Sequence, residues 1–540
     1  MRRKIQGLMF AVCLPLVCAA AGPGPGPGPR YANPIIYADY SDPDVIRVGG
    51  DYFMVASSFH FSPGIPVLRS TDLVHWKIAG HVLDKLGFHP SYDMVPPYTL
   101  TDAASKPVGK GMRYAGGVWA PSIRHHNGLF YVYWATPDEG IFMSSSANPA
   151  GKWSAPVKVL DGAGYEDPCP FWDDDGKAYL VHSKVGAGPV ILHAMSPDGK
   201  TLYDAGQTII EDKANLPILE GPKTYKRNGY YYIFAPIGGV ETGAQAVMRA
   251  RKIEGPYEYK SVLNPGNGLK GPHQGGYVET PSGQGWFIHF NSTGAFGRIA
   301  HLQPVVWQDD WPVMGAAGVP VSEHAYPDTG KPSADKIQDS DEFSGAKLGL
   351  QWSWNHNPDD ARWSLSQRPG FMRIEANKAT YLVGARNTLT QILQGPHAVI
   401  STRIEIGALA DAQRAGLSLF GVKLPWIGVT RDGGVNYLTY SNAGEETRGA
   451  RIDANAVILR AQVYESQMVQ FSYALKEGDA FKDFGPVTPL AKFSWWKGSR
   501  PAVFTYIKAD VDEAKSTHTG RDQIKQNYID IDWFRVSDWK

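Results

Sequence analysis

Three acidic residues mark copies of one phrase that repeats along the first part of the chain. Asp42 lies in SDPDVIRVGGDYFMVASS, Asp167 in DPCPFWDDDGKAYLVHS, and Glu220 directly before GPKTYKRNGYYYIFAP. Glycoside hydrolysis needs one carboxylic acid to protonate the leaving oxygen and a second carboxylate to activate water or attack the sugar. Taken singly, each acid also fits an ordinary turn or strand end. Their shared place in the repeat favours a catalytic site, to which equivalent strands bring them.

The repeated phrase itself predicts β-structure. Two more copies, APSIRHHNGLFYVYWAT and GGYVETPSGQGWFIHFN, carry no acid at this point. Turns such as Asn127-Gly128, Asp175-Gly176 and Asn228-Gly229 each precede an aromatic-rich strand, which is typical of hairpins. Long helical periodicities are missing, and 59 glycines and 40 prolines supply many turns. We therefore expect an all-β protein whose first domain is a β-propeller.

The composition limits the classes of partner. The chain has 540 residues, with 53 Lys and Arg against 53 Asp and Glu, so its formal net charge is zero. This balance argues against a general nucleic-acid binder. No apolar stretch is long enough for a membrane-spanning helix, so we expect no membrane insertion. Two of the three cysteines lie near the N-terminus, and Cys169 is expected to pack inside a strand rather than to react.

The N-terminus resembles an export signal. A basic start, Arg2 to Lys4, is followed by an apolar run, and Ala19 and Ala21 suit cleavage after residue 21. We therefore expect a signal peptide over residues 1–21 and a periplasmic or secreted enzyme. Residues 22–32 form a Gly-Pro linker of the extended kind.

Further boundaries follow from where the repeat stops. We expect a propeller catalytic domain over residues 33–325 and a Pro/Gly/charge linker over residues 326–336. Residues 337–540 show alternating segments such as Ser401 to Ile406. About 200 residues of this pattern fit a two-sheet β-sandwich.

The chain resembles glycoside hydrolase family 43. The resemblance covers the whole first domain and rests on NPIIYADYSDPDVIRVGGDYFMVASSFHFSPGIPVLRSTDLVHW, GGVWAPSIRHHNGLFYVYW, YEDPCPFWDDDGKAYLVHS, EGPKTYKRNGYYYIFAPIGG and GRIAHLQPVVWQDDWPV. The second region resembles the concanavalin-like (jelly-roll) C-terminal sandwich of β-xylosidases, through RWSLSQRPGFMRIEA, ARNTLTQ and YIDIDWFR. The resemblance implies a five-bladed propeller followed by this sandwich.

The resemblance also implies roles within an inverting mechanism. Asp42 matches the general base, Glu220 the general acid, and Asp167 the third acid, which tunes the pKa of the general acid and holds the sugar. Glu166 stands where the family often has an apolar residue, so an exchange of roles between Glu166 and Asp167 is the alternative. Arg298 matches an arginine that reaches the sugar, with a structural salt bridge as the alternative.

Three aromatic residues and one histidine are further candidates. Trp119, Phe59 and Phe61 are expected as stacking walls for the sugar or its leaving group, or else as blade core. His273 matches a histidine near the propeller axis, beside which relatives sometimes hold calcium or water. We expect no required cofactor, with a structural calcium near His273 left open. Asp173-Asp174-Asp175-Gly176 lacks later calcium ligands and is expected to be a hairpin turn.

The expected activity is exo-acting release of terminal α-L-arabinofuranose or β-D-xylose. The partners are then the pentose-containing saccharides of plant cell walls, such as hemicellulose and its oligosaccharides. Between the two sugars, we favour an α-L-arabinofuranosidase with β-xylosidase activity. The alternatives are a sugar-binding propeller without catalysis and an endo-acting arabinanase of the same fold. The presence of all three acids favours an enzyme, and the long loop from His89 to Arg113 with the appended sandwich favours a closed pocket.

Overall fold

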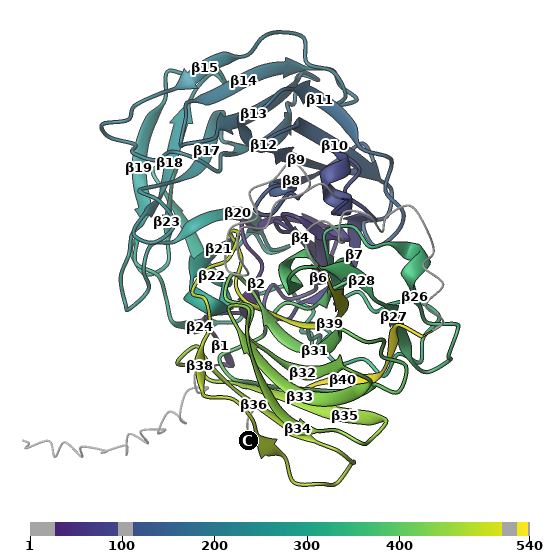
Figure 1. Ribbon diagram of the computed structural model, residues 1–540. Coiled ribbons are helices and arrows are strands. Elements are labelled where there is room, and N and C mark those ends of the chain that lie inside the picture. The colour runs from purple at the N-terminus through teal and green to yellow at the C-terminus, as the bar shows by residue number, and fades with distance from the viewer. Residues whose placement is uncertain (1–27, 96–111, 510–525, 538–540) are drawn as a thin grey trace, which may run out of the picture.

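A computed structural model describes residues 28–95, 112–509 and 526–537 (Figure 1). The expected signal peptide, most of the Gly-Pro linker and much of the loop from His89 to Arg113 lie outside these residues. The described chain forms a five-bladed propeller followed by a two-sheet sandwich. This confirms the all-β fold predicted from the sequence.

The first four blades are four-stranded antiparallel sheets. Their strands are, blade by blade, β3 (Asp44–Val48), β4 (Asp51–Val55), β6 (Gly64–Ser70) and β7 (Lys77–Leu83); β8 (Trp119–His126), β9 (Leu129–Thr136), β10 (Gly140–Ser146) and β11 (Val157–Asp161); β12 (Tyr165–Trp172), β13 (Ala178–Lys184), β14 (Val190–Met195) and β15 (Gln207–Ile210); β16 (Lys223–Arg227), β17 (Tyr230–Ile237), β18 (Ala244–Ala250) and β19 (Glu258–Leu263). Because β8 contacts both β3 and β12, the first strands of the blades line the central axis.

The fifth blade closes the ring with a strand from the beginning of the domain. It contains β20 (His273–Glu279), β21 (Gly285–Ser292), β22 (Arg298–Gln308), β23 (Trp311–Met314) and the early strand β2 (Ile36–Asp39). Both β2 and β23 pair with β22. The pairing of β2 with β22 therefore joins the first and last parts of the propeller.

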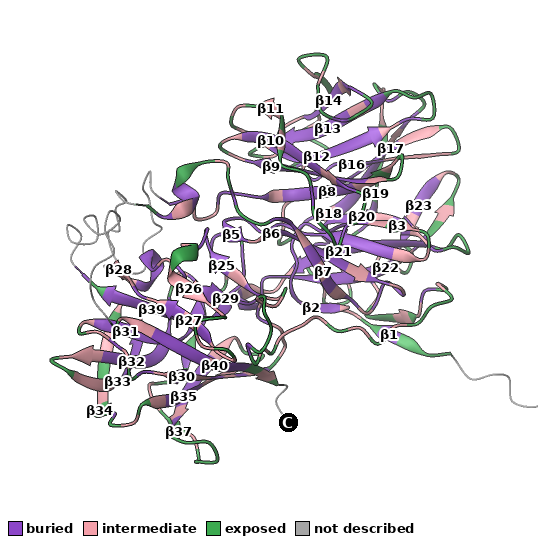
Figure 2. Ribbon diagram, turned by 90° about the vertical axis from the view of Figure 1, so that its right-hand side faces the viewer, coloured by how far each residue is buried: buried purple, intermediate pink, exposed green. Residues whose placement is uncertain are grey.

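The two-residue turns and the burial patterns follow the predicted logic. Asn127 and Gly128 have φ values of 47° and 79°, and Asn228 and Gly229 have 49° and 72°. Two successive positive φ angles fit the type I′ hairpin turn, which asparagine and glycine tolerate. Strand β9 is buried over almost its whole length, since a blade packs between two neighbours (Figure 2).

The sandwich consists of a nine-stranded and an eight-stranded sheet. The first contains β5 (Phe61–Ser62), β25 (Ser353–Asn355), β28 (Asn377–Ala379), β29 (Leu389–Thr390), β31 (Gln413–Phe420), β32 (Trp426–Asp432), β33 (Val435–Asn442), β34 (Glu445–Arg451) and β39 (Arg500–Lys508). The second contains β26 (Trp363–Ser364), β27 (Met372–Glu375), β30 (Ala398–Glu405), β35 (Ala456–Val463), β36 (Met468–Ala474), β37 (Lys482–Asp483), β38 (Thr488–Pro489) and β40 (Tyr528–Ser537). Strand β30 alternates buried with half-buried residues, as a sheet with one covered face requires.

Helical structure among the described residues is limited to four short 3-10 segments. These are η1 (Pro90–Asp93), η2 (Gly294–Phe296), η3 (Asp360–Arg362) and η4 (Leu382–Gly384). In the same part of the chain, no helix has the length and apolar character needed to span a membrane.

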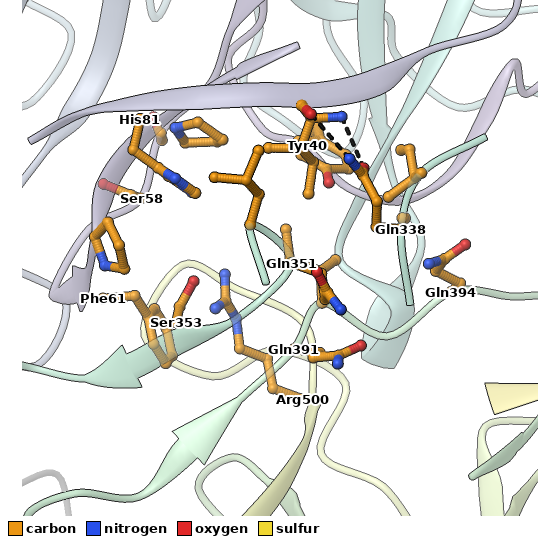
Figure 3. A pocket seen from close by; sticks show the side chains of 18 residues that line it. Tyr40, Ser58, Phe61, His81, Gln338, Gln351, Ser353, Gln391, Gln394 and Arg500 are labelled. Carbon is orange, nitrogen blue, oxygen red and sulfur yellow. Dashed lines mark hydrogen bonds between the residues drawn. The ribbon is translucent and has the colours of Figure 1, made fainter. Parts of the chain in front are cut away.

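The two parts share a sheet and an interface. Strand β5 leaves the first blade and pairs with β25, so it becomes the edge of a sandwich sheet. A short ladder of β1 (Arg30–Ala32) with β24 (Glu323–Ala325) places residues of the expected Gly-Pro linker in a strand. A cavity of about 20 Å³ lies at the interface, and the guanidinium of Arg500 points into it (Figure 3). That volume has room for a water molecule.

Candidate active site

Each blade carries one residue with a left-handed backbone at its inner end. These residues are Asp42, Ala120, Asp167, Gly221 and Gln274, with φ values of 55°, 33°, 56°, 61° and 32°. In three blades the strand register also shifts at this point. Such a bulge breaks the alternation of side chains, so the left-handed residue and the one before it both face the axis.

Glu220 does not occupy the same place in the repeat as Asp42 and Asp167, so that expectation is wrong by one residue. The left-handed place in blade 4 belongs to Gly221, and Glu220 precedes it, level with Glu166 in blade 3. A Cβ atom on Gly221 would come 2.7 Å from Cγ of Gln274, so this place has no room for a side chain. The three acids still lie close together, because the left-handed place and the place before it both face the propeller axis.

One cavity of about 480 Å³ brings the three acids together at the propeller axis. Its walls come from all five blades and from the sandwich. The lining residues are Asp42, Phe59, Trp119, Ala120, Glu166, Asp167, Val185, Gly186, Ala187, Ile218, Glu220, Val240, His273, Gln274, Arg298 and Trp496. Of the predicted site residues, only Phe61 is missing from this cavity.

Two side chains hold the carboxyl group of Asp42 in place. Arg298 Nη1 donates to both of its oxygens, at 3.1 and 3.3 Å, and Ser57 Oγ donates to Oδ2 at 2.6 Å. The Ser57 hydroxyl oxygen in turn accepts from the backbone N–H of Ala120 at 2.7 Å. A charged donor and a neutral donor thus both bind this carboxyl group. Arg298 thus contacts the proposed base directly, in the ion pair that was the alternative to a sugar contact.

Asp167 and Glu220 differ in the donors around them. Asp167 Oδ2 accepts from the backbone N–H of Gly221 at 2.6 Å and from Ser183 Oγ at 3.3 Å. Burial, and then the charge of Glu220, raises the pKa of Asp167 to about 7, while buried Lys223 opposes the rise. Within the described residues, no side-chain hydrogen bond to the Glu220 carboxyl is formed. The charge state of Asp167 is therefore set by its burial and by the carboxyl group of Glu220 beside it.

His273 lies against the carboxyl group of Glu220. Its Nε2 is 2.8 Å from Oε1 of Glu220, although the two atoms are not aligned for a hydrogen bond. Calcium prefers six to eight oxygen ligands. Among the described residues, no group of three or more His, Cys, Asp or Glu side chains could hold a metal ion. A structural calcium near His273 stays a prediction.

The aromatic candidates separate into two groups. Phe59 and Trp119 line the active-site cavity, with ring centroids 6.3 Å apart in an edge-to-face arrangement. Phe61 lies instead in β5, where the Arg500 guanidinium stacks 3.7 Å from its ring centroid and where it borders the small interdomain cavity (Figure 3). Its place in a strand shared with the sandwich removes it from the sugar site.

The sandwich contributes a tip that sequence reasoning missed. Trp496, 43% exposed, lines the cavity beside Trp119, with ring centroids 5.9 Å apart. The next residue, Lys497, is buried, and its Nζ donates to the carbonyl oxygen of Ser57 at 2.9 Å. The backbone N–H of Gly498 donates to Asp39 Oδ2 at 2.9 Å. The sequence Trp-Trp-Lys-Gly between two strand patterns could have marked this tip as an exposed aromatic loop. It could not have indicated that the loop contacts the propeller.

The chain matches two family models in order. Residues 31–312 match the model described as Glycosyl hydrolases family 43, and residues 340–537 match the Beta xylosidase C-terminal Concanavalin A-like domain. A relative from Xylanibacter ruminicola, named provisionally as a beta-xylosidase, is 45% identical over 75% of this chain and 73% of its own. The non-reducing end alpha-L-arabinofuranosidase BoGH43B of Bacteroides ovatus is 32% identical over 65% of this chain and 66% of its own.

A solved structure shares the whole architecture. It is described as a bifunctional GH43-CE protein of Bacteroides eggerthii and superposes with a TM-score of 0.81 at 30% sequence identity. The superposition covers 94% of this chain and 64% of that chain. This chain therefore spans about two thirds of the length of that bifunctional relative.

Proposed function

Because the chain belongs to glycosyl hydrolases family 43, we propose that this glycoside hydrolase is exo-acting and inverting. It releases terminal α-L-arabinofuranose, and β-D-xylose as a second glycone, from hemicellulose-derived saccharides. The observation that carries the proposal is the convergence of Asp42, Asp167 and Glu220 from three blades on one cavity. Relatives named for beta-xylosidase and alpha-L-arabinofuranosidase support the choice of pentoses.

The reaction assigns one role to each acid. Asp42, held by Arg298 and Ser57, takes a proton from water as that water attacks the anomeric carbon. Glu220 gives its proton to the leaving oxygen as the glycosidic bond breaks. The sugar leaves with inverted configuration. For each bond cleaved, Asp42 gains one proton and Glu220 loses one. Asp167, beside Glu220 and hydrogen-bonded to Gly221, is the third acid, which modulates the general acid and holds the sugar.

Attack on chain ends is supported by the size of the cavity and by the sandwich residue in its wall. Trp496 of the sandwich lies beside Trp119 at the cavity wall. A cavity of about 480 Å³ is within the range of small-ligand pockets, roughly 300–1,000 Å³. An endo-acting enzyme needs a groove long enough for a polymer, so a cavity of small-ligand size favours the exo mode.

Hydrolysis of aryl α-L-arabinofuranoside and aryl β-D-xyloside by the mature protein tests the proposal, with Asp42→Asn as the inactive control. We expect phenol release from both substrates, faster from the arabinofuranoside, and none from the variant. The released sugar should first appear as the inverted anomer by NMR. Release from neither substrate would overturn the pentosidase proposal. Cleavage of linear arabinan alone would then indicate an endo-arabinanase, and sugar binding without turnover would indicate a binding propeller.

A further inference from the structure

Glu166 is a fourth carboxyl group in the cavity and has no role in the mechanism above. It precedes Asp167 in β12, and the register of β12 with β13 shifts between Glu166 and Cys169. Because the left-handed backbone of Asp167 interrupts the alternation of the strand, both consecutive acids face the cavity. Glu166 thereby takes in blade 3 the place that Glu220 takes in blade 4.

The surroundings of Glu166 are those of an uncharged carboxyl. The residue is 5% exposed, and its Oε1 has no hydrogen-bond partner among the described residues. The charged groups that face it are carboxyls, namely Asp167, Glu220 and, less strongly, Asp42. Burial, and then the charge of Asp167, raises the pKa of Glu166 to about 10. No cation contacts it within the described residues, so the protonated form is favoured at neutral pH.

A neutral carboxyl is a suitable partner for a sugar hydroxyl. It presents one O–H donor together with acceptor oxygens, and a hydroxyl group likewise both donates and accepts. A buried polar atom that lines a cavity and lacks a protein partner is expected to meet its partner in the ligand. The backbone N–H of Ala187 also donates to the carboxyl group, and Glu166 lines the cavity beside Asp167.

We propose that Glu166, in its uncharged form, hydrogen-bonds a hydroxyl group of the pentose glycone and so fixes the sugar between Asp42 and Glu220. The proposal rests on the proposed function, because it concerns the sugar bound in that site. It assigns to Glu166 substrate binding rather than proton transfer. It also answers the alternative raised by the sequence, since Asp167 keeps the contact with the backbone of Gly221 beside the acid.

Two variants of Glu166 separate hydrogen bonding from charge. Glu166→Gln keeps a neutral donor and acceptor of the same shape, whereas Glu166→Leu keeps the volume and removes both. We expect kcat/KM of Glu166→Gln to stay within about threefold of wild type and that of Glu166→Leu to fall roughly 10- to 100-fold. The alkaline limb of the pH profile should not move in Glu166→Gln, because no charge is lost. Equal rates for all three proteins, or a Glu166→Gln limb displaced to lower pH, would overturn the proposal.

Binding in a catalytically silent background separates this proposal from the proposed function. Calorimetry with the two aryl pentosides compares Asp42→Asn alone with Asp42→Asn/Glu166→Gln and Asp42→Asn/Glu166→Leu, each checked for folding by circular dichroism. We expect only the leucine variant to bind 10- to 100-fold more weakly. Equal affinity across the series, or no binding by any of them, overturns the role of Glu166. If only the leucine variant binds the pentosides more weakly and wild type does not hydrolyse them, the proposed hydrolysis is refuted and the hydroxyl contact of Glu166 is retained.

Discussion

Replacing Lys497 by methionine tests whether the tip of the sandwich is locked inside the propeller. The Lys497 side chain is 1% exposed, and its Nζ donates to Ser57 O at 2.9 Å and lies 3.8 Å from Asp39 Oδ2. Burial lowers the pKa of Lys497 from 10.5 to about 8, with the charge of Asp39 opposing the fall. The unfolded chain, in water, keeps the ordinary value. Lys497→Met is therefore expected to change how stability depends on pH.

The sign and size follow from proton linkage. Between pH 8 and 10.5 the unfolded chain holds a proton on Lys497 that the folded chain has lost, so this residue makes the free energy of unfolding rise with pH. One pKa unit corresponds to about 1.4 kcal/mol, which gives a rise of about 3 kcal/mol across this interval. The free energy of unfolding of wild type minus that of Lys497→Met should increase by this amount, whatever its value at pH 7.

Urea unfolding at pH 7.5, 8.5, 9.5 and 10.5 measures this difference. Lys492→Met is the matched control, because Lys492 lies in the same segment but is exposed, and its difference from wild type should stay flat. Lys497→Met should also lower kcat on aryl arabinofuranoside, since the carbonyl of Ser57 loses its donor while the Ser57 hydroxyl binds Asp42. A difference between wild type and Lys497→Met that does not change with pH would refute the burial of this ammonium group and the interface built on it.

Four further substitutions test the site. Glu220→Gln should lower kcat/KM about 10²- to 10⁴-fold on pentosides with poor leaving groups and much less on activated aryl pentosides; near-normal rates on the former would exclude Glu220 as the acid. Asp167→Asn should unfold at higher temperature than wild type at pH 8 but not at pH 4. The reason is that the pKa of Asp167 is raised to about 7, so wild type loses stability as pH rises from about 4 to 7. Equal differences in melting temperature at both pH values would contradict this. Phe61→Leu should lower thermal stability and leave KM unchanged, since Phe61 packs under Arg500; a raised KM would return Phe61 to the sugar site. Trp496→Ala should raise KM roughly 2- to 10-fold through loss of an aromatic wall, and an unchanged KM would show that the sugar does not reach it.

Local patterns in the sequence were sufficient for the architecture. Asn-Gly turns and alternating strands depend on the backbone and on burial within a few residues, and both appear as predicted at Asn127 and in β30. The acids were found because a repeat reports which strand ends share an axis. Phe61 was misplaced because its strand leaves the first blade to join a sheet whose other members begin almost 300 residues later, at Ser353. No pattern within the first blade indicates that exchange.

The place of Glu220 shows what a repeat can and cannot specify. The phrase fixes where the left-handed residue of each blade lies. In blades 3 and 5 this residue and the one before it both line the cavity, so either place can carry the functional group. In blade 4 the close approach of Gln274 restricts the left-handed place to glycine, and the acid moves one residue earlier. In blade 3 both places hold an acid, Glu166 and Asp167. An inner strand that presents a catalytic acid at one of these two places can therefore present a second carboxyl group at the other place. The charge state of that second carboxyl group is set by which cations and backbone donors reach it.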